Sequence, residues 1–143
     1  MSTIFLEQFL AVVGVATCLL ISARMGQVVS EMQPVWPLPG LYLVEMNIVS
    51  LLGLFGVVGN SSGRFSLRVG LTWAAAGILL AFAIMGAWSI GLFFLPVVLI
   101  FAVTAILSNR RQGQNMLLYV GISILAAMAQ VALMWVVIRI VNL

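Results

Sequence analysis

Five long apolar runs, separated by short segments that carry most of the charged residues, divide the chain. A bilayer core about 30 Å thick is crossed by about 20 helical residues, and it offers no water to unpaired backbone groups, so only helices and closed barrels span it. Barrel strands alternate polar and apolar side chains, whereas these runs are continuously apolar. The sequence therefore predicts an all-α polytopic membrane protein, a single domain built as a bundle of five transmembrane helices. The expected spans cover about residues 4–23, 41–59, 68–87, 91–108 and 116–138 of the 1–143 chain.

The first apolar run is closed by Arg24. Ile21, Ser22 and Ala23 resemble a signal-peptide cleavage site, which is the alternative interpretation of this segment. A signal peptide begins with a basic region, and Glu7 occupies that place here. We therefore expect a retained helix with Glu7 near its N-terminus, where the helix dipole favours a carboxylate.

A proline-rich segment follows the first run, with Pro34, Pro37 and Pro39 close together. Proline lacks a backbone donor and disfavours helical conformation in the residue before it. The sequence therefore predicts an extended outer loop over residues 25–40, with Trp36 at the level of the lipid headgroups.

Residues 69–108 contain no charged side chain. A helix of that length would be about 60 Å long, which is about twice the bilayer core, so the segment must fold back on itself. We expect the hairpin at residues 86–91, with Trp88 at the interface and Pro96 in the opening turn of the next helix.

Composition excludes a soluble fold, because 64% of the residues are hydrophobic and only 6% are charged. Ordinary soluble domains have about 25% charged residues. Three acidic and six basic residues cannot cover the exterior of a water-soluble domain of this length. The apolar surface must therefore face lipid.

The basic residues are all arginines, and their positions predict the orientation. With five crossings, Arg64, Arg68, Arg110 and Arg111 lie on one side of the membrane, and Arg24 and Arg139 lie on the other. The positive-inside rule then places the N-terminus in the cytoplasm and the C-terminus outside. We expect the four cytoplasmic arginines to contact lipid headgroups or, alternatively, an acidic surface of a partner. An arginine-only basic complement hints at a GC-rich prokaryotic genome, and hence at a prokaryotic plasma (inner) membrane.

Small residues mark helix-packing faces, because they let helix backbones approach closely in lipid. The third run carries a seam of such residues, and the second run carries two glycines on the side of Glu45. The predicted helix-packing positions are Gly70, Ala74, Gly77 and Ala81 in the seam, with Gly53 and Gly56 in the second run.

Glu45 is the principal candidate for function, since ionisable groups within spans are costly unless they are paired or hydrated. We expect it to face the bundle and to pair with Arg24 or Arg139, which lie at the same membrane boundary. The alternative is a carboxylate that binds a proton or a cation. Gln130 lies on a polar stripe of the fifth helix, typical of hydrogen bonding between helices and alternatively of a pathway lining.

The composition also excludes several chemistries within this chain. Without His or Asp there is no Ser-His-Asp triad, histidine-ligated haem or carboxylate-histidine metal site, and without Lys there is no Schiff base. The single Cys18 permits neither an internal disulfide nor a cysteine metal site. The arginines form no basic face, so nucleic-acid binding is unsupported. We therefore expect no cofactor and no catalysis.

These observations favour a non-enzymatic membrane subunit or scaffold, whose partners are membrane lipids and either other membrane subunits or copies of itself, packed through the small-residue seam. The alternative is a small transporter or channel in which Glu45, Asn47, Ser50 and Gln130 line a polar path. A membrane-embedded enzyme acting on lipid is a third possibility, disfavoured by the missing nucleophile and base.

Overall fold

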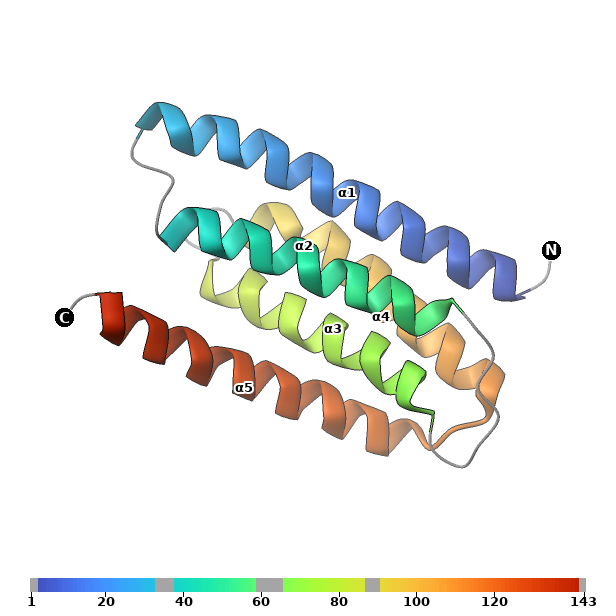
Figure 1. Ribbon diagram of the computed structural model, residues 1–143. Coiled ribbons are helices and arrows are strands. Elements are labelled where there is room, and N and C mark those ends of the chain that lie inside the picture. The colour runs from blue at the N-terminus through green and yellow to red at the C-terminus, as the bar shows by residue number, and fades with distance from the viewer. Residues whose placement is uncertain (1–2, 33–37, 59–65, 87–90, 142–143) are drawn as a thin grey trace.

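The computed structural model describes residues 3–32, 38–58, 66–86 and 91–141. Within them the helices are α1 (Thr3–Met32), α2 (Leu38–Val57), α3 (Leu67–Met85), α4 (Leu95–Gln112) and α5 (Met116–Val141), with a 3₁₀ turn, η1 (Gly91–Phe94), before α4. All five α-helices are long and apolar enough to cross a membrane. The predicted all-α bundle is thus confirmed. The beginning of α1 and the end of α5 lie at opposite ends of the bundle (Figure 1).

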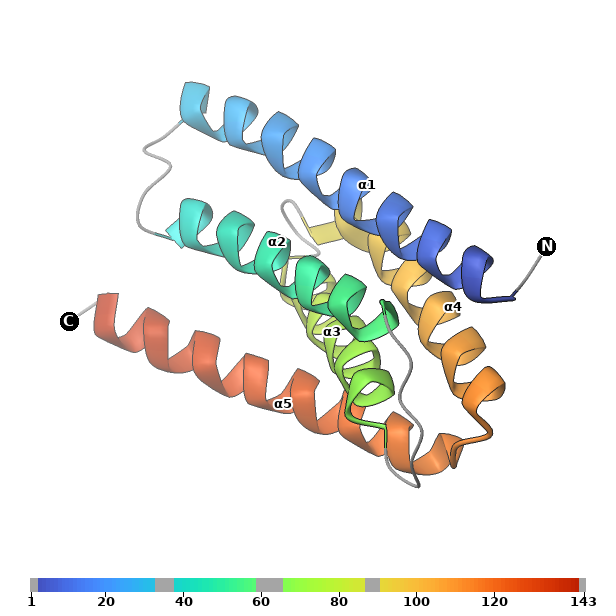
Figure 2. The same ribbon diagram turned by 45° about the vertical axis from the view of Figure 1, so that its right-hand side comes forward.

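The central helix of the bundle is α3, which packs against α2, α4 and α5. Figure 1 shows α3 between α2 and α5, and Figure 2 shows α1 lying along α2 and α4 on the far side from α5. In the most apolar stretch of each helix, 61% of the residues of α3 are buried but only 6% of those of α5, although both helices are long and apolar enough to span a bilayer. Most of the surface of α5 is therefore available to lipid.

Large side chains fill the space between α1, α2, α3 and α4. Phe82 and Phe101 are fully buried. The ring of Tyr42 meets Phe82 edge-on at 4.7 Å, and its hydroxyl donates a 2.8 Å hydrogen bond to the Phe82 carbonyl oxygen. A methyl group at Gly53 would lie 2.5 Å from the ring of Phe101, and one at Gly14 would lie 2.9 Å from it. Glycines on two helices therefore make room for one aromatic side chain, the close packing that holds helices together in lipid.

The first connection is shorter than the sequence predicts. α1 continues past Arg24 to Met32, so the expectation that residues 25–32 belong to an outer loop is wrong. No proline interrupts the chain before Pro34, and polar side chains are tolerated where a helix emerges from hydrocarbon into the interface. α2 begins at Leu38 and holds Pro39 in its first turn, where a missing backbone donor costs nothing. Residues 33–37, including Trp36, lie outside the described residues.

The predicted hairpin at residues 86–91 lies mostly outside the described residues, but Gly86 and Gly91 at its two ends are described. Gly86 ends α3 and Gly91 begins η1, and the Gly91 N–H donates a 2.7 Å hydrogen bond to the Gly86 carbonyl oxygen. The chain therefore reverses between these two glycines, as predicted for residues 86–91. Trp88 and Arg64 are not among the described residues.

Tyr119 anchors the beginning of α3 to α5. Its buried hydroxyl accepts a 2.9 Å hydrogen bond from the Ser66 N–H and donates one of 3.3 Å to the Ser66 carbonyl oxygen. We expect Tyr119→Phe to lower the free energy of unfolding by about 1–3 kcal/mol, because it removes a partner of buried backbone groups. Thermal unfolding of the purified protein in mild detergent measures this, and a midpoint equal to that of wild type would contradict it.

Candidate functional site

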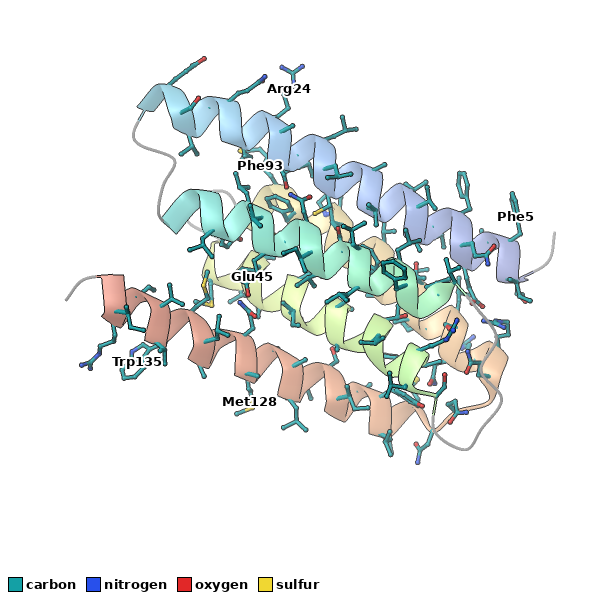
Figure 3. The ribbon with its side chains drawn as sticks, in the orientation of Figure 1. Phe5, Arg24, Glu45, Phe93, Met128 and Trp135 are labelled. Carbon is teal, nitrogen blue, oxygen red and sulfur yellow. The ribbon has the colours of Figure 1, made fainter. Side chains whose placement is uncertain are left out.

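A hydrogen bond between two polar side chains links α2 and α5 within the apolar part of the bundle. Gln130 Nε2 on α5 donates to Glu45 Oε1 on α2 at 2.8 Å. Gln130 is buried and Glu45 is half-buried. Figure 3 shows Glu45 pointing from α2 toward α5. Since both helices pack mainly on α3, this bond joins two helices that otherwise have little contact.

Glu45 lies at the edge of a lipid-facing surface. It is seven residues inside the beginning of α2, or about 10 Å along the helix, within the stretch that can span a membrane. Residues four before and three and seven after it share its side of the helix. These are Leu41, Ile48 and Leu52, whose exposed fractions are 41%, 52% and 45%. The carboxyl group thus stands between the bundle and the surrounding hydrocarbon.

The structure does not bring Glu45 to either expected counter-ion, so that prediction is wrong. Arg24 points away from the bundle on α1 (Figure 3). On α5, Arg139 is nine residues from Gln130, which places it about 180° around the helix, and its Cζ lies 4.6 Å from the ring centre of Trp135 instead. Among the described residues, Glu45 forms no salt bridge.

Glu7 and Arg111 form the salt bridge of the described residues. Arg111 Nε lies 3.0 Å from Glu7 Oε1 and 3.1 Å from Oε2, which ties the first turns of α1 to the last turn of α4. Glu7 is fully buried, whereas the side chain of Arg111 keeps 19% of its exposure. The sequence analysis did not predict this pair, in which a guanidinium adds to the helix dipole in balancing Glu7. The contact of Arg111 with headgroups stays a prediction. The sequence indicated only that Glu7 and Arg111 lie on the same side of the membrane, which is a requirement for this pair.

The remaining arginines of that membrane side differ from one another. Arg68 donates a hydrogen bond to the carbonyl oxygen of Val58 and thereby caps the end of α2. Arg110 is exposed at the end of α4, where it can meet headgroups. Among the described residues, the arginines predicted on that membrane side therefore have three different roles: Arg111 pairs with Glu7, Arg68 caps α2, and Arg110 is exposed at the end of α4.

The small-residue seam of α3 lies against α5. A methyl group at Gly77 would collide with the backbone carbonyl oxygen of Ser123, and one at Gly70 would lie 3.7 Å from Tyr119. On α2, a methyl group at Gly56 would collide with the hydroxyl of Thr72 on α3. These small residues therefore hold the chain's own helices together, and the hypothesis that partners pack through the α3 seam is wrong.

The other polar side chains of the proposed path bond within their own helix. Asn47 Nδ2 donates to the Leu43 carbonyl oxygen at 2.8 Å, and the Ser50 hydroxyl donates to the Asn47 carbonyl oxygen at 2.9 Å. Neither contacts Glu45 in any hydrogen bond of the described residues. The part of the chain that the structure describes also contains no group of three His, Cys, Asp or Glu side chains that could hold a metal ion.

Comparison of the chain with protein-family models, curated proteins and solved structures gave no match.

Proposed function

We propose that this protein is a non-enzymatic subunit of a membrane complex, set in a prokaryotic plasma membrane with its N-terminus in the cytoplasm. The proposed contact with a second membrane-spanning chain is the Glu45 surface, defined as Leu41, Glu45, Ile48 and Leu52 of α2 with Ala126, Gln130 and Leu133 of α5. The observation that carries the proposal is the position of the Glu45 carboxyl group, which accepts a hydrogen bond from a neutral amide and lies beside the exposed side chains of Leu41, Ile48 and Leu52.

The energetics favour a further partner for this group. An acidic side chain near the centre of a span costs about 2.5–3.5 kcal/mol, and the cost falls toward the interface. One hydrogen bond to a charged group returns about 1.5–3 kcal/mol, and less when both groups are neutral. The Gln130 bond therefore offsets much of the cost, but it involves one oxygen of a carboxyl group that can accept several hydrogen bonds. A donor or cation from a neighbouring helix would supply the remainder.

The shape of the surface also suits a helix. Ala126 and Leu133 share the side of α5 that carries Gln130, and Leu133 is 50% exposed. Because Ala126 is small, the backbone of a partner helix can approach α5 closely there, beside the longer side chain of Leu133. We infer a partner helix that carries an Arg or a Lys side chain opposite Glu45.

The first test is crosslinking in native membranes. In a Cys18→Ser background, Ile48→Cys is labelled with a maleimide that carries a photoactivatable benzophenone, and illumination is expected to give a crosslinked adduct of discrete mass. Adding Glu45→Gln is expected to reduce the yield about tenfold, because losing one ionic contact of about 1.4 kcal/mol weakens association by that factor. Glu31→Gln is the matched control, since Glu31 is exposed near the end of α1. An adduct yield that Glu45→Gln leaves unchanged, or the absence of any discrete adduct, would contradict the proposal.

A transporter is the second candidate, with the same carboxyl group carrying a proton or a cation. A membrane-embedded carboxyl with a neutral hydrogen-bond partner supports it. The fully buried Met46, Phe82 and Phe101 fill the interior of the bundle, so a path would run along a surface shared with a second chain. Flux measured in proteoliposomes separates the candidates: transport that requires Glu45 supports this one, and flux unaffected by Glu45→Gln removes the residue from any such mechanism.

A further inference from the structure

A groove runs between α3 and α5 on the side of α5 turned away from Glu45. It has a volume of about 480 Å³ and is lined by apolar residues, among them Leu80 and Ile84 of α3 and Met128, Ala132 and Trp135 of α5. Figure 3 shows Met128 and Trp135 pointing away from α2, whereas Glu45 points toward α5 from the opposite side. The groove is therefore separate from the Glu45 surface.

An exposed arginine stands at the end of this groove. Arg139 lies one turn beyond Trp135, and its guanidinium Cζ is 4.6 Å from the centre of the indole ring. Among the described residues it forms no salt bridge. Tryptophan and arginine near the end of a span are typical of the boundary between hydrocarbon and headgroups. The groove thus begins in hydrocarbon and ends beside a cation at the interface.

The dimensions of the groove match one leaflet. On α5 its lining runs from Ala127 to Trp135, a rise of about 12 Å. Half of a hydrocarbon core about 30 Å thick is about 15 Å. A chain that enters at Arg139 and follows the groove would therefore end near the middle of the bilayer.

We propose that the groove and Arg139 form a binding site for one phospholipid, with an acyl chain along the groove and the phosphate on the guanidinium. The lining offers a ligand almost no hydrogen-bonding partner, which favours a hydrocarbon chain over a polar molecule. A guanidinium binds phosphate oxygens through paired N–H donors, and stacking on Trp135 limits its orientations. A single cation at the end of a narrow apolar groove complements a lipid, which has its charge at one end.

Native mass spectrometry in mild detergent tests this, with phosphatidylglycerol added at known concentrations. The wild-type protein is expected to retain one tightly bound lipid. Arg139→Gln is expected to weaken its apparent affinity about fivefold, the effect of losing one cation near a lipid surface. Arg24→Gln is the matched control, because Arg24 is also exposed but lies on α1, which contributes no residue to the groove, and it is expected to leave the affinity unchanged.

A second variant tests the acyl-chain contact without touching the cation. Ala132 is exposed and lines the groove, so Ala132→Phe is expected to fill the groove and abolish the tight lipid while the protein stays folded. Equal lipid retention by wild type, Arg139→Gln and Ala132→Phe would overturn the proposal, since it would show a non-specific lipid shell. A lipid-free dimer that Ala132→Phe dissociates would also overturn it, because a second copy would then occupy the groove.

Discussion

Gly77→Ala is expected to displace α5 from α3 and to lower the free energy of unfolding by about 1–3 kcal/mol, the usual range for adding a methyl group to a packed interior. The added methyl would collide with the backbone carbonyl oxygen of Ser123. A flexible side chain could rotate away, but a backbone oxygen moves only with its helix. The bond between Gln130 and Glu45 should break as well, because it depends on where α5 lies.

Gly121→Ala is the matched control for this prediction. It adds the same methyl group to the same helix pair, but apart from the neighbouring turns of α5 no atom lies within 4 Å of that methyl group. The substitution should leave stability unchanged or raise it by up to about 1 kcal/mol, since alanine is the better helix former. Thermal unfolding in detergent of both variants decides the matter, and equal midpoints would show that α5 does not pack as described.

Arg111→Gln is expected to have the largest effect in the chain, a loss of about 3–5 kcal/mol, because removing one member of a buried ion pair leaves the other charge uncompensated. Glu7 is fully buried, and both of its carboxylate oxygens accept a hydrogen bond from Arg111 Nε. Its carboxylate would remain between α1 and α4 without a cation. We therefore expect α1 to detach from α4 at a lower temperature than in wild type.

The two members of the pair should not be equivalent. Glu7→Gln is expected to cost less than Arg111→Gln, because the arginine side chain keeps 19% of its exposure and can turn toward headgroups. The double variant, with two neutral amides, should recover part of the loss. Unfolding midpoints of the four proteins form a double-mutant cycle, and additive effects of the two substitutions would contradict a direct pair.

The number and type of the spans follow from local sequence, because a long apolar run must be a helix wherever lipid surrounds it. The arrangement of the spans does not follow. Lipid and protein interior are both apolar, so hydropathy cannot distinguish a central helix from a peripheral one. In their most apolar stretches, 61% of the residues of α3 are buried but only 6% of those of α5. The small residues gave a better signal, since Gly70 and Gly77 face α5 in the structure.

The pairs of the candidate site were harder to predict for the same reason. Glu7 and Arg111 are 104 residues apart, and Glu45 and Gln130 are 85 apart, so each pairing depends on which helices become neighbours. The sequence predicts that Arg24 and Arg139 lie at the same membrane boundary as Glu45, but it could not reveal that neither side chain points toward Glu45 in the structure (Figure 3). Such contacts depend on which side of each helix faces the other helices, and packing determines that side.

The location of the two chain ends in intact membrane vesicles tests whether the chain crosses the membrane five times. An epitope tag at each terminus is exposed to protease from one side at a time. Five helical crossings predict that the tags are digested from opposite sides, with the N-terminal tag on the cytoplasmic side. Digestion of both tags from the same side would contradict the five crossings and, with them, the arrangement of every site described above.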